Sequence, residues 1–166
     1  MTGVQTCALP ILTITDTRTF ENDKSGAILV KKIEEAKHNL IDRKICKDNK
    51  KDIVKILKDW TNQKNIDVII TTGGTGLTGR DITPEAIDEI ADKHIPGFGE
   101  VFRTISLKTV GTSAIQSRAC AVLANGKYVF ALPGSSGGVT DAWDEIGRAH
   151  VWTPVTGEYR MPSSAW

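Results

Sequence analysis

The hydrophobic residues of this chain follow two spacings, one typical of helices and one typical of buried strands. Apolar side chains recur at helical spacing over residues 28–40, with Ser25 as the expected N-cap, and again over residues 53–60. Between these segments lie short apolar runs rich in β-branched residues, at 12–15, 40–46 and 66–71. The run at 66–71 is nearly continuous, which is typical of a strand covered on both faces. The first half of the chain is therefore predicted to alternate strands with helices.

The second half adds a hairpin and two further helices. Asn125-Gly126 separates the apolar runs 119–124 and 127–132, and this dipeptide favours a tight turn between antiparallel strands. Thr83-Pro84-Glu85 combines an N-cap, a first-turn proline and a first-turn acid, and predicts a helix over 86–93. A last helix is expected to start near Asp141. Together the elements predict an α/β fold with helices on both faces of a mostly parallel, mixed sheet.

Size, charge and cysteine content narrow the class of protein. A chain of 166 residues has the size of one domain. Lys and Arg number 21 against 20 Asp and Glu, and the basic residues form no block, so nucleic acid is not an expected partner. The longest apolar stretches are strand-sized, which argues against a membrane segment. The cysteines, Cys7, Cys46 and Cys120, fit neither a disulfide framework nor a metal motif, and a cytoplasmic protein is expected.

Both ends of the chain differ from its middle. With suitable synonymous codons, one stretch of DNA encodes Thr2–Ile11 on one strand and Gly147–Pro154 on the complementary strand. This relation is typical of translated sequencing-adapter DNA, although a natural tail is the alternative. We therefore expect residues 1–11 and 146–166 to be artefactual extensions and residues 12–145 to form the domain.

The best single sign of a ligand site is a glycine-rich turn after the buried run. Thr72 is followed by Gly73, Gly74, Thr75 and Gly76. Glycine permits positive φ and lets backbone N–H groups approach an anion, and a following helix N-terminus adds partial positive charge. A phosphate or pyrophosphate is the expected ligand. A tight turn without ligand is the alternative, since neither GxGxxG nor GxxxxGK[ST] is present.

A second turn of the same kind follows the last predicted strand. Pro133, Gly134 and Ser135 begin a segment rich in glycine and hydroxyl groups that extends to Gly138. Ligands of such sheets bind beyond the carboxyl ends of the strands. Two glycine-rich turns at one sheet edge therefore predict a binding cleft.

Two aspartates in loops on the same side are candidate metal ligands. Asp48 and Asp81 each precede a predicted helix. A carboxylate beside bound phosphates usually requires Mg²⁺ between them, because direct contact is repulsive. The alternative is that each acid only starts its helix, and Asp16 has the same two interpretations. His38 and His94 have no Cys or His at metal-ligand spacing and are expected on helix surfaces.

Four ordered sequence blocks resemble the MoaB/MogA family of molybdenum cofactor biosynthesis proteins, with MoaB closer through the segment GFGEVFR. The blocks are 66–83 (IDVIITTGGTGLTGRDIT), 95–107 (IPGFGEVFRTISL), 111–118 (GTSAIQSR) and 130–135 (FALPGS). The resemblance implies a three-layer α/β sandwich that binds molybdopterin and assembles into homotrimers or hexamers. It also implies adenylylation of molybdopterin with Mg²⁺ and ATP.

The resemblance also assigns residues to roles. Asp48 and Asp81 match the acidic residues of the family, expected to be catalytic and to hold the metal. The residues expected to bind the substrate are those of the two turns: Thr72, Gly73, Gly74, Thr75, Gly76, Pro133, Gly134 and Ser135.

Two departures from the family leave other functions open. The segment Asp16-Thr17-Arg18 matches the family's first loop only loosely, and the family's C-terminal helix is expected to be missing. One alternative is a pterin-binding or scaffold protein of the MoaB type without catalysis. Another is a fragment of a multidomain relative of the competence-damage or molybdotransferase type.

Overall fold

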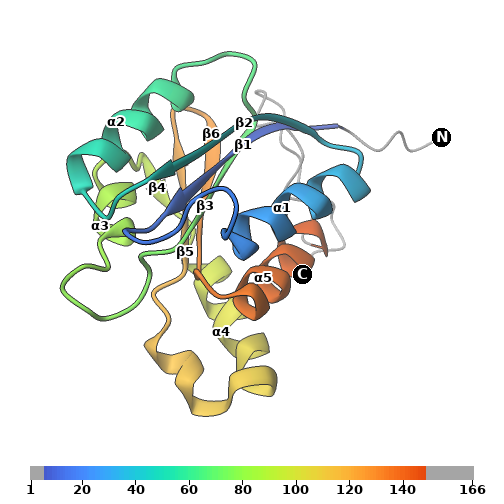
Figure 1. Cartoon of the computed structure of the whole chain (residues 1–166), viewed down its shortest axis with the longest axis vertical. Coiled ribbons are helices and arrows are strands. Elements are labelled where there is room, and N and C mark those ends of the chain that lie inside the picture. The colour runs from blue at the N-terminus through green and yellow to red at the C-terminus, as the bar shows by residue number, and fades with distance from the viewer. Residues whose placement is uncertain (1–5, 149–166) are drawn as a thin grey trace.

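The chain forms a six-stranded sheet in the order β2-β1-β3-β6-β5-β4 (Figure 1). The computed structural model describes residues 6–148. The strands are β1 (Ala8–Ile14), β2 (Asn39–Cys46), β3 (Val68–Thr72), β4 (Lys93–His94), β5 (Cys120–Ala124) and β6 (Lys127–Leu132). The helices are α1 (Lys24–Glu35), α2 (Lys50–Thr61), α3 (Thr83–Asp88), α4 (Pro96–Val110), the 3-10 helix η1 (Gly111–Gln116) and α5 (Ser136–Arg148).

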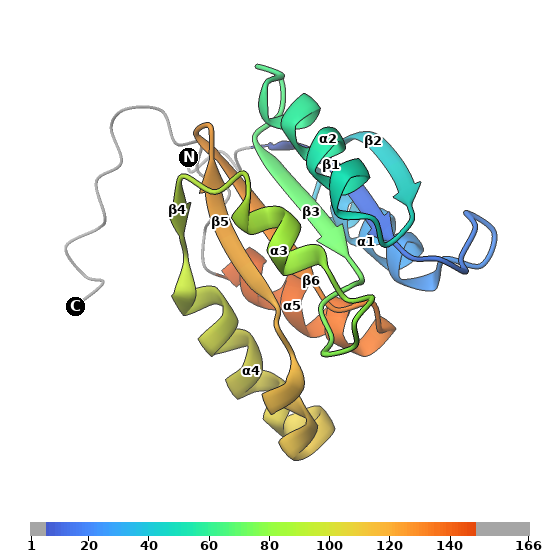
Figure 2. The ribbon, with the colours of Figure 1, turned by 90° about the vertical axis from the view of Figure 1, so that its left-hand side faces the viewer.

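Helices cover both faces of the sheet, which confirms the predicted three-layer sandwich. Helices α1 and α5 lie on one face, and α2 and α3 lie on the other (Figures 1 and 2). Successive side chains of a strand point to opposite faces of the sheet, so the core has two halves. In β3, Val68 and Ile70 face the layer of α1 and α5, whereas Ile69 faces the layer of α2 and α3. This two-sided burial explains the continuous apolar sequence of β3.

The sheet is mixed, as predicted. β1 pairs in parallel with β2 and β3, and β3 pairs in parallel with β6. β5 runs antiparallel to both β6 and β4. The β5–β6 turn contains Asn125 and Gly126 with φ of 48° and 74°, values that both residues tolerate. The carboxyl ends of β1, β2, β3 and β6 therefore meet at one edge of the sheet.

The first strand starts earlier than the sequence analysis placed it. β1 begins at Ala8, so Ala8–Ile11 belong to the sheet although they lie within the segment expected to be an extension. The N–H of Ala8 donates to Asp67, and Leu9 and Ile11 are fully buried. Pro10 is tolerated in this interior strand because the register with β2 shifts at that position. The expected extension residues 1–5 and 149–166 lie outside the described residues.

Several helix starts also differ from the predictions. Asp23, rather than Ser25, caps α1 by accepting from the N–H of Gly26. α5 starts at Ser136 instead of near Asp141, because Ser135 accepts from the N–H of Gly138 and so caps the helix. The predicted helix 86–93 is the shorter α3.

The two histidines also lie elsewhere than expected. His94 lies in the edge strand β4 rather than on a helix. His38 is half-buried, and its Nδ1 accepts from the N–H of Cys7.

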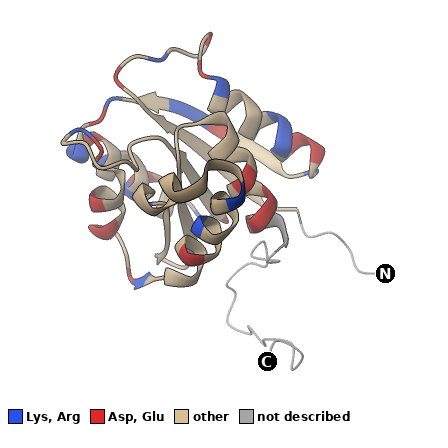
Figure 3. Cartoon of the chain, turned by 90° about the horizontal axis from the view of Figure 1, so that it is seen from below, with Lys and Arg blue, Asp and Glu red and all other residues tan. Residues whose placement is uncertain are grey.

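In the view of Figure 3, acidic and basic residues are interspersed along the described part of the ribbon. In the described part of the chain, no helix is long and apolar enough to cross a membrane.

Candidate ligand-binding site

The two glycine-rich turns lie against each other at the carboxyl edge of the sheet. A methyl group placed on Gly134 would lie 3.3 Å from the Cα of Gly73. Both turns contribute to a cavity of about 790 Å³. The structure thus brings together the residues predicted from separate segments: Gly74, Thr75, Gly76, Asp81, Pro133, Gly134 and Ser135 line this cavity.

Gly73 is held in a position that no larger residue can take without a shift of the backbone. Its φ is +102°, and a Cβ would lie 2.2 Å from the carbonyl oxygen of Ile14 at the end of β1. Its N–H donates to the carbonyl of Leu132 at the end of β6. The turn is therefore fixed between the strands on both sides of β3.

The carbonyl groups of both turns accept hydrogen bonds from residues outside the turns. Thr83 donates through Oγ1 to the carbonyl of Gly73 and through its N–H to that of Gly74. Arg118 donates to the carbonyls of Thr75 and Gly76. In the second turn, Thr72 Oγ1 donates to Pro133 at 2.8 Å, and Arg18 donates to Gly134 at 3.0 Å. Every carbonyl from Gly73 to Gly76, and those of Pro133 and Gly134, is therefore engaged.

The amides of the turns have the opposite arrangement. Within residues 6–148, the N–H groups of Gly74, Thr75, Gly134 and Ser135 donate no hydrogen bond. A peptide unit whose carbonyl is held on one side presents the N–H of the next residue on the other. The first turn of α5 adds the partial positive charge of a helix N-terminus. Backbone N–H groups at the cavity edge are therefore available to bind an anion.

The loop around Arg18 is anchored by a buried carboxylate. Asp23 is 2% exposed and accepts from Thr13 Oγ1 at 2.7 Å and from Arg43 at 3.0 Å. Burial alone would raise the pKa of Asp23, but these bonds and the N–H of Gly26 outweigh it and lower the pKa. Ser25 bridges Asp23 to Arg18. Asp23, the N-cap of α1, therefore also positions Arg18, which donates to the second turn.

Asp81 lines the cavity and is held by its own loop. Its Oδ2 accepts from the N–H of Thr78 at 2.9 Å and from the hydroxyl of Thr78 at 2.6 Å. Burial would raise the pKa of Asp81, but the bonds from Thr78 and the charge of Arg118 lower it. Asp81 is thus a carboxylate at neutral pH, with a fixed orientation at the edge of the glycine turn.

Asp48 lies beside the turn and does not line the cavity. A Cβ on Gly74 would lie 3.0 Å from its Oδ1. Burial raises the pKa of Asp48, and the negative charges of Asp16 and Asp81 raise it further, while Arg80 opposes them. Arg80 pairs with Asp16. The crowding of negative charge around Asp48 favours a cation.

The donor set suits a magnesium ion completed by a substrate. Among residues 6–148, no group of three or more His, Cys, Asp or Glu is arranged to hold a metal ion. Mg²⁺ usually binds one or two carboxylates together with substrate phosphates, rather than an all-protein cage. Asp48 and Asp81, acting on each other electrostatically, fit that pattern.

The predicted site residues Thr72, Gly73 and Asp48 do not line the cavity, and α4, η1 and α5 contribute cavity residues that were not predicted. Thr72 is fully buried and braces Pro133 instead of lining the cavity. Phe102, Ser106 and Asp141 form part of the cavity wall. Phe102 and Ser106 lie within the sequence block 95–107, but an apolar pattern does not tell which helix face borders a cavity.

Comparison with known proteins places the chain in a family. The family model described as "Probable molybdopterin binding domain" matches residues 10–151. Molybdenum cofactor biosynthesis protein B of Bacillus cereus is 45% identical over 137 residues, which cover 82% of this chain and 81% of the relative.

Solved structures agree with this placement. A crystal structure of molybdenum cofactor biosynthesis protein B superimposes with a TM-score of 0.85 at 41% identity, over 92% of this chain and 98% of that one. The tungsten cofactor synthesizing protein MoaB from Pyrococcus furiosus gives a TM-score of 0.79 at 33% identity, over 88% and 93% of the two chains. The chain therefore belongs to the MoaB/MogA family of molybdenum cofactor biosynthesis proteins.

Proposed function

We propose that this protein binds molybdopterin, with the terminal phosphate on the two glycine-rich turns. The observation that supports this most strongly is the set of amides without a partner among the described residues, at Gly74, Thr75, Gly134 and Ser135, which line the same cavity as the start of α5. Backbone amides and a helix terminus suit a phosphate without needing a lysine or arginine.

We further propose that the bound phosphate is adenylylated. The pterin phosphate attacks the α-phosphorus of ATP, and pyrophosphate leaves with the electron pair of the broken bond. Asp48 and Asp81 would hold Mg²⁺, which supplies charge neutralisation for the triphosphate when bound. The chain's own contribution is to position the phosphate on the turns and keep Asp81 ionised and oriented through Thr78. Such a reaction depends on positioning and electrostatics, and needs no nucleophilic side chain.

Pyrophosphate release with molybdopterin, ATP and Mg²⁺ tests the reaction. Asp81→Asn keeps the hydrogen-bonding shape and removes the charge, and we expect it to reduce turnover by roughly 100-fold or more while the pterin still binds. Asp92→Asn, on the opposite side of the fold near Asn125, is the matched control. Absence of turnover by a folded wild-type protein that binds the pterin would refute adenylylation.

A second candidate function is pterin binding without catalysis. Two observations favour it: Asp48 does not line the cavity, and Oδ2 of Asp81 is already occupied by Thr78. In that case calorimetry would show molybdopterin binding that is unchanged in Asp81→Asn, and no AMP transfer.

We also propose a homo-oligomer, a trimer or hexamer, in the cytoplasm. Large apolar side chains at the end of α4 and in η1 are exposed, with Leu107 at 47%, Val110 at 56% and Ile115 at 74%. Exposed apolar residues that gather on one segment are typical of an interface. Light scattering measures the molar mass of the assembly directly. Ile115→Lys is expected to reduce this molar mass.

A further inference from the structure

The loop from Gly76 to Asp81 leaves the sheet edge without an apolar anchor. Residues 77–80 are exposed, and Leu77 is 67% exposed. The loop ends with the carboxylate of Asp81 back against the glycine-rich turn, since a Cβ placed on Gly76 would lie 2.7 Å from its Oδ2. Thr78 and Asp81 bind each other, which shapes the loop but does not attach it to the rest of the fold. The position of Asp81 therefore depends on residues outside the loop.

Arg118 donates to both ends of this loop. Its Nε donates to the carbonyl of Gly76 at 2.7 Å, and its Nη2 donates to the carbonyl of Asp81 at 2.7 Å. Because both nitrogens belong to one planar, rigid guanidinium group, they fix the two carbonyls relative to each other. Arg80 also pairs outside the loop, with Asp16, but its side chain is 73% exposed, and exposed ion pairs fix geometry weakly. Among the described residues, Arg118 is therefore the main attachment of the loop.

Arg118 is itself held from three sides. Its Nη1 pairs with Glu85 in the first turn of α3, and its own N–H donates to the carbonyl of Thr75 at 3.0 Å. The carbonyl groups of the residues before and after it accept from Arg103 of α4, at 3.3 Å each. Arg118 does not line the cavity. It can therefore act on a ligand only through the residues that it holds, of which Asp81 is one.

We propose that Arg118 is the positioning residue for Asp81, and that it makes phosphate binding on the glycine-rich turn depend on a divalent cation. This inference rests on the proposed function, in which Asp81 helps to hold Mg²⁺ beside the bound phosphate. Residues that orient a metal-binding carboxylate typically contribute roughly 10- to 100-fold to metal affinity. Arg118 has this relation to Asp81, because it fixes the backbone from which the carboxylate projects.

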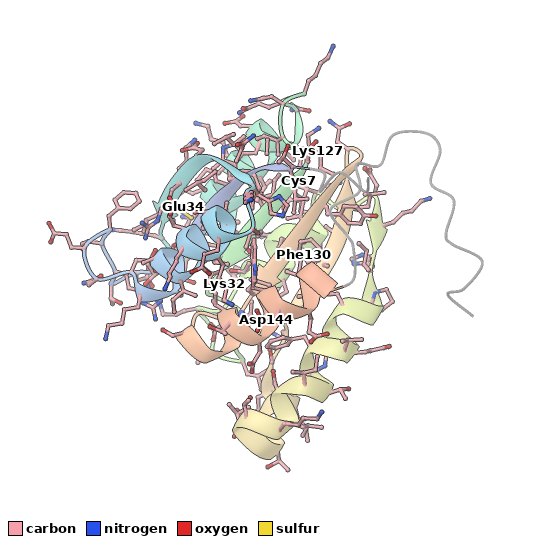
Figure 4. The ribbon with its side chains drawn as sticks, turned by 90° about the vertical axis from the view of Figure 1, so that its right-hand side faces the viewer. Cys7, Lys32, Glu34, Lys127, Phe130 and Asp144 are labelled. Carbon is pink, nitrogen blue, oxygen red and sulfur yellow. The ribbon has the colours of Figure 1, made fainter. Side chains whose placement is uncertain are left out.

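Three variants and one matched control test this role in the full chain. Arg118→Met keeps the bulk of the side chain and removes its charge and its donors, whereas Arg118→Lys keeps the charge without the planar group. Glu85→Gln removes the charge that pairs with Arg118. Lys32→Met is the control, because the pair of Lys32 with Asp144 is buried to a similar degree and joins α1 to α5 instead (Figure 4).

Hydrogen exchange measures the attachment of the loop without any ligand. The N–H of Asp81 donates to the carbonyl of Thr78, so its protection reports whether the loop keeps its shape. Exchange over residues 76–82 is expected to be at least about 10-fold faster in Arg118→Met and Arg118→Lys than in wild type, and unchanged in Lys32→Met. Wild-type exchange in Arg118→Met would overturn the attachment of the loop by Arg118.

Calorimetry with inorganic pyrophosphate measures the dependence on the cation. Wild type is expected to bind pyrophosphate more tightly with Mg²⁺ than with a chelator. Most of this gain is expected to be lost in Arg118→Met and Arg118→Lys, a weakening of roughly 10- to 100-fold, and Glu85→Gln is expected to weaken it by about 3- to 10-fold. Binding without Mg²⁺ is expected to weaken by only about 3-fold, because residue 118 keeps its backbone bond to Thr75.

The other outcomes separate this inference from the proposed function. If Arg118→Met retains the wild-type gain from Mg²⁺, the role of Arg118 is refuted and the proposed function stands, even when the urea midpoint of the variant is lowered. Wild-type behaviour of Arg118→Lys shows that the positive charge acts rather than the planar group, which overturns positioning through the two carbonyls. If wild type binds pyrophosphate equally with and without Mg²⁺, the metal role proposed for Asp81 fails together with this inference.

Discussion

Replacing Gly73 with alanine tests whether the glycine-rich turn 73–76, the proposed phosphate site, is fixed by its packing against β1. Alanine in a left-handed backbone costs roughly 1–2 kcal/mol. The added Cβ would also lie 2.2 Å from the carbonyl oxygen of Ile14, which forces the turn or the strand end to move. Overpacking of this kind costs about 1–3 kcal/mol, so the free energy of unfolding is expected to fall by roughly 2–5 kcal/mol.

Two other glycines separate the cost of backbone strain from the cost of overpacking. Gly126 also has positive φ, at +74°, but a Cβ there meets nothing within 4 Å, so Gly126→Ala isolates the backbone strain at about 1–2 kcal/mol. Gly79 has open space and no positive φ in this range, so Gly79→Ala is expected to be neutral or to stabilise by up to about 1 kcal/mol. Their loops are both exposed, which makes them matched controls.

Urea unfolding followed by tryptophan fluorescence measures all three variants. With an m-value of about 2 kcal/mol per M, Gly73→Ala is expected to lower the midpoint by roughly 1–2 M. It is also expected to abolish pyrophosphate binding, which Gly126→Ala and Gly79→Ala retain. If Gly73→Ala is no less stable than Gly126→Ala, the turn is not tightly packed against β1, and the argument for a preformed phosphate site is refuted.

Two further predictions concern an aspartate and two cysteines whose pKa values depart from the ordinary values of these side chains. The lowered pKa of Asp23 means that its contribution to stability is complete above the ordinary aspartate value of about 4 and is lost as the pH falls below it. Asp23→Asn should therefore lower the free energy of unfolding by roughly 2–4 kcal/mol at pH 7 and make it depend less on pH below about 4. The same pH dependence in the variant and in wild type would contradict this. Burial raises the pKa of Cys46 to about 12 and that of Cys120 to about 11. Both residues are half-buried. At pH 8 both thiols should react at least about 100-fold more slowly with a thiol reagent than in urea, and fast reaction of the native protein would contradict their raised pKa values.

Hydrophobic periodicity was enough to predict the layers and the sheet type. The continuous apolar sequence of β3 predicted a strand buried on both faces, and Asn125-Gly126 predicted the antiparallel hairpin. Both signals are local, since they depend only on neighbouring residues. The two glycine-rich turns were also predictable from neighbouring residues. Because each turn follows a strand of the parallel part of the sheet, both lie at the same sheet edge.

Features that depend on distant residues were not predictable. Pro10 argues against an interior strand, and only the register shift against β2 makes it acceptable. Asp23 and Ser25 are both good caps, and the choice between them is decided by Arg43 from β2. Arg118 was likewise not predictable as a positioning residue, because its bonds to Gly76 and Asp81 join segments that are far apart in the sequence.

The hydrogen bonds around the two turns explain how the fold would make the proposed phosphate site from backbone groups, with no basic side chain lining the cavity. Thr83, Arg118, Thr72 and Arg18 engage the carbonyl groups, and none of them donates to the cavity side of the turns. An anion that accepts from the amides without a partner in the protein would add its binding free energy to the stability of the fold. If the proposed function holds, phosphate affinity and the stability of the loaded protein depend on the same four residues, because these residues hold the carbonyl groups of both turns.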